Sequence, residues 1–196
     1  MTQQTRQRNR RGEGSLLRAE LVEAAARLVE STGSADAVTL RAVAREAGVA
    51  APSIYRHFTD IAELLRAVVA DRFQRLDEDL AQAMAGTSEA GVATLRACCA
   101  AYCAFGLAHP GHYRVLFGPV LSFDPATGVP GQDVFQRLVD AVAACRDGVT
   151  SADARQAAAN VWTALHGIVS LRTSRPTFPW PPVAEQIESA LRAAAP

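Results

Sequence analysis

The densest group of reactive side chains in this 196-residue sequence is a trio of cysteines, Cys98, Cys99 and Cys103. On a helix, Cys99 and Cys103 share one face at positions i and i+4, and a disulfide needs Cα atoms within roughly 7 Å of each other. A thiol-redox sensor is therefore one hypothesis. Buried cysteine is also a common small apolar residue, and no basic residue adjoins the trio to lower a thiol pKa. We expect reduced, packed cysteines and keep redox sensing as an alternative.

Patterns for catalysis and metal binding are missing from the sequence, which has no glycine-rich phosphate loop, no Gly-x-Ser-x-Gly and no His-Glu-x-x-His. His109 and His112 could share a metal ion, but no cysteine or carboxylate at ligand spacing completes the set, so we interpret both as loop histidines. We therefore expect no enzymatic activity, no cofactor and no metal. A helical-bundle transferase that uses the cysteines is the enzymatic alternative.

The overall composition is that of a folded protein, with 49% hydrophobic residues and a formal net charge of +0. Zero net charge argues against a protein that coats nucleic acid non-specifically. The N-terminus is polar, and no apolar run approaches the ~20 residues that span a bilayer. We therefore expect a cytoplasmic protein that contacts no membrane.

The basic charge is unevenly distributed. All twenty basic residues are arginine, and Arg6, Arg8, Arg10 and Arg11 lie within the first twelve positions, which contain no acid. Such a run is either a solvated tail or an arm that follows the DNA backbone or enters the minor groove. We expect residues 1–14 to form a flexible basic arm in which Arg8, Arg10 and Arg11 contact DNA.

Residues 39–60 carry the signals of two short helices joined by a sharp turn. Thr39 is a good N-cap for the first helix, and Gly48, which tolerates a positive φ, ends it. Pro52 suits the first turn of the second helix, where its missing N–H would have no partner. Ile54 and Phe58 then share one face at i and i+4. The other face of this helix would be free to enter the major groove of DNA.

This segment resembles the helix-turn-helix of the TetR family of bacterial transcriptional regulators. The residues that carry the resemblance are Ala47-Gly48-Val49 and Ser53-Ile54-Tyr55-Arg56-His57-Phe58, followed by Leu64 and Leu65. The family usually has a lysine where this chain has Ile61, so a frequent phosphate contact is missing. We expect the DNA backbone to be held, instead of by that lysine, by Thr39, Arg41, Tyr55 and the backbone N–H groups near Asp60.

The resemblance implies a set of DNA-contacting residues. Arg56 is the first choice for a base contact, because arginine reads guanine through O6 and N7. The whole expected set is Thr39, Arg41, Ala50, Ala51, Pro52, Ser53, Tyr55, Arg56 and His57, together with Arg8, Arg10 and Arg11 of the arm. A purely structural helical hairpin is the alternative.

Hydrophobic periodicity predicts an all-α chain of about nine helices, because no segment shows sustained period-two alternation. Helices are expected near residues 15–32, 40–47, 52–58, 61–85, 89–108, 112–117, 133–142, 151–172 and 183–194, with Ser15, Asp60, Ser151 and Asp153 as caps. Residues 15–60, with the start of the helix at 61–85, would form a three-helix DNA-binding domain. Residues 61–196 would form a ligand-binding and dimerisation domain.

The C-terminal half resembles a branch of the same family that carries Trp-x-x-x-His-Gly, here Trp162, His166 and Gly167. In the family, the last two long helices pair with those of a second subunit, which implies a homodimer in which Gly167 allows close approach. In the family, helices of this domain also surround an apolar ligand pocket. The residues on these helices that we expect to bind a ligand are Tyr102, Phe105, Tyr113, Phe117, Trp162 and His166. Each of these could equally be ordinary core.

The sequence thus predicts a dimeric TetR-like regulator that binds a palindromic operator in double-stranded DNA, most simply as a repressor released by a small apolar effector. When bound to DNA it would be associated with the bacterial nucleoid. A small-molecule sensor or carrier on the same fold that no longer binds DNA is the alternative, and Ile61 is the one hint of it.

Overall fold

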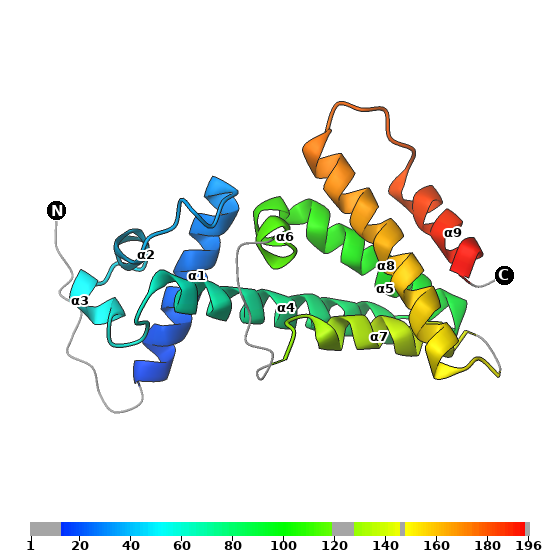
Figure 1. Ribbon diagram of the computed structural model, residues 1–196, viewed down its shortest axis with the longest axis horizontal. Helices are drawn as coiled ribbons and strands as arrows, with labels where there is room; N and C mark the ends of the chain where they lie inside the picture. The colour runs from blue at the N-terminus through cyan, green and yellow to red at the C-terminus, as the bar shows by residue number, and fades with distance from the viewer. Residues whose placement is uncertain (1–12, 119–127, 146–147, 195–196) are drawn as a thin grey trace.

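The computed structural model of the protein describes residues 13–118, 128–145 and 148–194, and all regular structure in these ranges is α-helical (Figure 1). The predicted all-α class and the number of helices are confirmed. The described helices are α1 (Glu13–Thr32), α2 (Leu40–Glu46), α3 (Ala51–Ile54), α4 (Ile61–Ala85), α5 (Val92–Ala108), α6 (Pro110–Leu116), α7 (Gln132–Ala143), α8 (Ser151–Ser174) and α9 (Val183–Ala194). Residues 1–12 of the predicted basic arm lie outside the described residues, whereas Glu13 and Gly14, which were predicted to belong to it, form the start of α1.

Side-chain caps determine where several helices begin. Thr39 accepts a hydrogen bond from the Ala42 N–H at 3.2 Å, and Asp60 accepts one from the Glu63 N–H at 2.7 Å, as predicted. The prediction that Ser151 caps α8 is wrong by one residue. Thr150 is the N-cap, because its hydroxyl reaches the Asp153 N–H at 3.1 Å.

The start of α5 also differs from the prediction of a helix from residue 89. The helix begins at Val92, because Gly91 has a φ of 77°, a left-handed conformation that glycine adopts without a steric penalty. Val92 is therefore exposed at the helix end.

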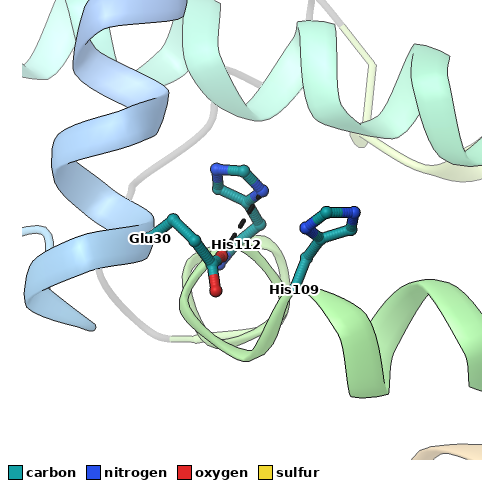
Figure 2. Close-up of side chains that lie close together, drawn as sticks. All are labelled: Glu30, His109 and His112. Atoms are coloured by element: carbon teal, nitrogen blue, oxygen red, sulfur yellow. Dashed lines mark hydrogen bonds and ion pairs between the residues drawn. The ribbon is translucent and has the colours of Figure 1, made fainter.

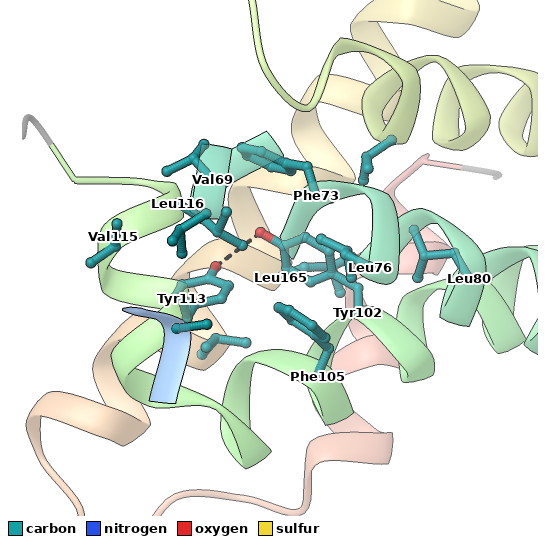
Figure 3. Packing of buried hydrophobic residues seen from close by; sticks show 14 of the residues in the cluster. Val69, Phe73, Leu76, Leu80, Tyr102, Phe105, Tyr113, Val115, Leu116 and Leu165 are labelled. Carbon is teal, nitrogen blue, oxygen red and sulfur yellow. Dashed lines mark hydrogen bonds between the residues drawn. The ribbon is translucent and has the colours of Figure 1, made fainter. Parts of the chain in front are cut away.

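Helices α1, α2 and α3 lie together at one end of the molecule, and α8 and α9 lie at the other (Figure 1). The 25 residues of α4 span ~37 Å at ~1.5 Å per residue, so this helix leaves the first group and packs on α5 and α7. Figure 3 shows Phe73, Leu76 and Leu80 of α4 beside Tyr102 and Phe105 of α5, within one continuous hydrophobic core. The long helix therefore connects the α1–α3 group to the C-terminal helices through packed side chains.

Ion pairs reinforce the packing of α4 on its neighbours. The buried guanidinium of Arg72 binds the carboxylates of Glu23 on α1 and Asp71. A buried charge of this kind needs its partners, because unpaired it would carry a large desolvation penalty. Arg137 of α7 donates two hydrogen bonds of 2.7 Å to Asp77. These contacts tie α1 and α7 to the long helix.

Among the described residues, no single helix is long and apolar enough to cross a membrane. Helices α5 and α6 reach the required length and composition only when taken together, and the chain bends by 107° between them.

Candidate functional site

One aliphatic and one aromatic side chain, both buried, hold α3 and the turn after it against the rest of the α1–α3 group. Ile54 and Phe58 are both fully buried against the first helices, as their spacing predicted. Helix α3 itself covers only residues 51–54, but hydrogen bonds from the N–H groups of His57 and Phe58 to the Ile54 carbonyl, at 2.9 and 3.0 Å, continue the turn. The predicted recognition helix is thus one helical turn followed by a hydrogen-bonded turn.

Burial of one face leaves the opposite face of this segment in solvent. Tyr55 is 53% exposed, and Arg56 is also exposed and pairs with no carboxylate among the described residues. The other predicted DNA-contacting residues of the described chain are exposed or half-buried on α2 and α3: Thr39, Arg41, Ala50, Ala51, Pro52, Ser53 and His57. Arg8, Arg10 and Arg11 lie outside the described residues.

Helix α1 adds a cation that the sequence reasoning missed. The guanidinium carbon of Arg18 lies 4.8 Å from the centroid of the Phe58 ring, and Arg18 is exposed. A cation over an aromatic face is attracted by the ring quadrupole, which holds this arginine next to the turn. No local pattern could have signalled it, because Arg18 lies on α1 and Phe58 in the turn after α3, far apart in the sequence.

The start of α4 is occupied by carboxylates. Glu63 accepts hydrogen bonds from the N–H and the hydroxyl of Thr59 at 2.8 and 2.9 Å, and these bonds hold the Glu63 pKa below its usual value. The Glu63 N–H is in turn taken by Asp60. Two of the N–H groups expected to hold a phosphate near Asp60 are therefore already bonded within the chain. Ile61 is half-buried and packs on the core.

A cavity of about 520 Å³ lies between the helices at the other end of α4. Its volume and mostly apolar wall are typical of small-molecule sites. The lining residues come from α4 to α8 and the segment before α7, and they are Phe73, Leu80, Cys98, Tyr102, Leu116, Phe117, Val129, Pro130, Gly131, Gln132, Val134, Phe135, Leu138, Arg155, Trp162 and Leu165. Among the described residues, the only charged side chain in this wall is Arg155.

Three of the six predicted ligand-binding residues line this cavity, namely Tyr102, Phe117 and Trp162. The other three lie outside its lining. Phe105 packs against His109 with ring centroids 5.4 Å apart, and Tyr113 stacks on His166 at 5.3 Å.

The polar groups of these aromatic residues form one hydrogen-bonded chain behind the cavity wall. The indole N–H of Trp162 donates to the Tyr102 oxygen at 3.0 Å, the two tyrosine oxygens are 2.9 Å apart, and Tyr113 Oη is 2.7 Å from His166 Nδ1. Burial raises the pKa of Tyr102 to about 12 and lowers the pKa of His166, so the members of the chain are neutral. An indole can only donate, and one consistent direction therefore runs from Trp162 to an accepting His166.

The cysteine trio is buried in the core, with Cys98 reaching the cavity wall. All three are free thiols, and burial raises the pKa of both Cys98 and Cys103 to about 11. Burial raises the pKa of Cys99 as well. Thiols in this state are poor nucleophiles, which weakens the redox alternative.

The interpretation of His112 as a loop histidine is wrong. His112 lies within α6, is buried, and contacts Glu30 of α1, and the ring of His109 lies beside them (Figure 2). The carboxylate that the sequence failed to supply comes from a helix far away in the chain. Only the packing of α6 on α1 brings these three side chains together.

Comparison with known proteins places both halves of the chain in one family. Residues 21–68 match the bacterial regulatory proteins of the tetR family, and residues 95–194 match the tetracyclin repressor-like C-terminal domain. None of the curated proteins matches the chain.

Solved structures agree with this assignment at the level of the fold. A protein of unknown function from Rhodococcus sp. RHA1 is 27% identical with a TM-score of 0.73, and the match covers 98% of this chain and 97% of that one. A TetR-family transcriptional regulator from Streptomyces coelicolor is 21% identical with a TM-score of 0.65, covering 92% and 96%. FadR from Bacillus subtilis, a transcriptional regulator solved in complex with stearoyl-CoA, is 11% identical with a TM-score of 0.66, covering 90% and 97%.

Proposed function

This chain belongs to the TetR family of bacterial transcription regulators, and on that premise we propose that it is a homodimeric repressor released from a palindromic operator by a small apolar effector. The observation that carries the proposal is the α2–α3 surface, where Tyr55 and Arg56 are exposed on a turn whose other face is buried. Two-fold symmetry then sets the two recognition segments about one DNA turn, ~34 Å, apart or a multiple of it.

Arg56 reads a guanine in the major groove in this proposal, while Tyr55, Thr39 and Arg41 hold the phosphate backbone. Arg18 adds a further phosphate contact from α1. Arg41 and Arg18 supply the phosphate contact that the lysine makes in other members of the family, because the start of α4 has Ile61 and two carboxylates at that place. The basic arm strengthens binding through its arginines.

The effector is proposed to bind in the 520 Å³ cavity, with Tyr102, Phe117 and Trp162 in contact with it. The apolar wall suits an acyl or aromatic body, and Arg155 suits an anionic or hydrogen-bond-accepting end. FadR, which shares the fold, binds stearoyl-CoA, a ligand of this type. Phe105, Tyr113 and His166 then act indirectly, by holding the wall residues in place.

Dimerisation is proposed to use the outer faces of α8 and α9. A groove of about 390 Å³ between these helices is lined by small residues such as Ala164 and Gly167, and Leu171 beside them is 49% exposed. A Cβ at Gly167 would meet no atom of its own chain within 4 Å, so the room there is available to a partner helix. Exposed apolar and small residues of this kind are typical of helix-pairing surfaces.

Release of DNA is proposed to run through α4 and α6, which reach both the cavity and the α1–α3 group. An effector acts only through its difference in affinity for the two dimer geometries. At a typical coupling of about 1 to 3 kcal/mol, operator affinity falls ~5- to 150-fold.

The test is fluorescence anisotropy of the purified protein with labelled DNA from upstream of its own gene, beside a shuffled control, across a salt series. Binding of two chains to the upstream DNA alone, weakening steeply with salt, is the expected result. Arg56→Ala should weaken it ~5- to 150-fold and relax the base preference, whereas Arg175→Ala, exposed in the turn after α8, should not. Equal weak binding to both DNAs, at this site and across genomic fragments, would instead favour the carrier.

A further inference from the structure

We propose that Glu30, His109 and His112 form a site for a divalent transition-metal ion of the Zn²⁺ class, at the junction of α1 and α6 (Figure 2). The site lies apart from both the α2–α3 surface and the cavity. It therefore goes beyond the proposed regulatory function and does not depend on it.

The spacing of the donor atoms fits a small ion. One ligand atom from each residue lies within 4.8 Å of the other two, and His112 Nδ1 is 3.5 Å from Glu30 Oε2. Two ligands bound to Zn²⁺ at ~2.0–2.1 Å in tetrahedral geometry are ~3.4 Å apart. The Glu30–His112 pair already has this separation, and the exposed ring of His109 lies beside the pair, with its centroid 5.5 Å from that of His112, in position to supply the third ligand.

The hydrogen bonds of His112 direct a lone pair into the site. His112 Nε2 is 2.9 Å from the Ala26 carbonyl oxygen, which can only accept, so Nε2 carries the ring proton. In the neutral ring, Nδ1 is then an acceptor that faces a carboxylate oxygen, also an acceptor. A cation between them satisfies both. Histidine ligands commonly donate their second ring N–H to a backbone carbonyl in this way.

Glu30 is held in place by the backbone of α6. Its Oε2 accepts the His112 N–H at 2.9 Å, and its Oε1 accepts the Gly111 N–H at 3.4 Å. A carboxylate oxygen has more than one lone pair, so these bonds orient the group without exhausting it. Burial lowers the pKa of His112, which keeps the ring in the form that binds metal.

The donor set indicates the class of ion and the kind of site. Two imidazoles and one carboxylate suit Zn²⁺, Ni²⁺, Co²⁺ or Cu²⁺ better than Ca²⁺ or Mg²⁺. Three protein ligands with an exposed side at His109 leave a fourth position for water or another small ligand. A closed structural zinc site would have four protein ligands instead.

Occupancy of this site would add a metal bridge between α1 and α6, which already pack together and share hydrogen bonds. Gly111 lets α6 approach α1 closely, because a Cβ there would lie 2.7 Å from the Glu30 Cα. An ion that binds the folded protein and not the unfolded chain also raises its thermal stability by mass action.

The test uses untagged, metal-free, full-length protein titrated with Co²⁺ and then with competing Zn²⁺. We expect one equivalent per chain, visible d–d absorption of a nitrogen- and oxygen-ligated ion, and a rise in the melting temperature. Glu30→Gln and His109→Gln should each lower the affinity by at least ~10-fold. His57→Gln, a histidine on the α3 turn, is the matched control and should leave the affinity unchanged.

The two variants separate a metal site from a plain helix cap. Glu30→Gln also loses a charged acceptor for the first N–H groups of α6, so a loss of stability without metal is expected for it alone. His109→Gln removes an exposed ring and should fold normally by circular dichroism while losing the metal-dependent rise in melting temperature. Absence of saturable binding, equal affinity in both variants and the parent, or a thiolate-to-cobalt charge-transfer band from the cysteines would each overturn the proposal.

Discussion

The α2–α3 surface and the cavity bring their residues together in different ways. The predicted DNA-contacting residues of the surface all lie in one short stretch of chain, from Thr39 to His57, whereas the cavity wall contains residues from Phe73 to Leu165. On the surface, hydrogen bonds and two buried side chains orient the exposed ones locally. The cavity exists only once five helices have packed. A local motif can therefore be read from the sequence, and a cavity wall can be read only in part.

The largest expected effect tests whether buried side chains orient the exposed ones on the α2–α3 surface, and it compares two aromatic residues of the turn after α3. Phe58→Ala should lower the free energy of unfolding by about 3–5 kcal/mol, because it empties a fully buried site. Tyr55→Ala should change it by less than ~0.5 kcal/mol while weakening operator binding, since Tyr55 is exposed. Urea unfolding measures the stability of both variants, and fluorescence anisotropy with operator DNA measures binding. Equal destabilisation by the two changes would mean that the α3 turn is not oriented by Phe58.

The cysteines test whether the cavity region responds to redox chemistry. A thiol pKa of about 11 at Cys98 and Cys103, against ~8.5 for a free thiol, leaves ~300-fold less thiolate near neutral pH. Alkylation by iodoacetamide should be slower by about that factor in the folded protein than in urea, and should speed up as the pH rises toward 11, as peptide mass spectrometry would show. Rapid alkylation of the native protein, with loss of DNA binding under diamide, would restore the redox-sensing alternative.

A pair of glycine substitutions separates the α1–α6 junction from the outer face of α8. Gly111→Ala should lower the free energy of unfolding by about 1–3 kcal/mol, because its Cβ would lie within 2.9 Å of α1 backbone atoms. Gly167→Ala meets no atom of its own chain within 4 Å and should stabilise the helix by ~0.5–1 kcal/mol at protein concentrations too low for dimerisation. Thermal or chemical unfolding gives the sign of each. A loss of stability that appears only at concentrations where the protein is dimeric would mean that the Cβ clashes with the partner helix, and a loss at low concentration as well would contradict the prediction.

The smallest effect concerns Arg155, the one charged residue that the described part of the chain places in the cavity wall. Arg155→Gln should weaken binding of the anionic dye anilinonaphthalene sulfonate by ~2- to 5-fold, because an exposed ion pair contributes little. The neutral probe N-phenylnaphthylamine, which shares the aromatic body, should bind equally to both proteins. Fluorescence titration with the two dyes makes the comparison. Equal loss for both probes would mean that Arg155 shapes the wall and does not read charge.

Much of the fold follows from short-range signals in the sequence. Thr39 and Asp60 cap their helices as predicted, and Ile54 and Phe58 are buried as their spacing requires. The misjudged boundaries are local too. Gly91 takes a left-handed φ that delays α5, and Thr150 competes successfully with Ser151 as a cap. The choice between Thr150 and Ser151 is hard to make from the sequence, because threonine and serine have similar capping propensities.

What the sequence determines by itself in this protein is whatever depends on neighbours within about one helical turn: the all-helical class, most helix limits and the exposed face that carries Tyr55 and Arg56. Only the tertiary structure decides which distant side chains meet. It places Phe73 and Arg155 in the cavity wall and leaves Tyr113 and His166 behind it. It also sets Glu30 against His112, because packing between helices depends on the shapes of whole surfaces and not on spacing along the chain.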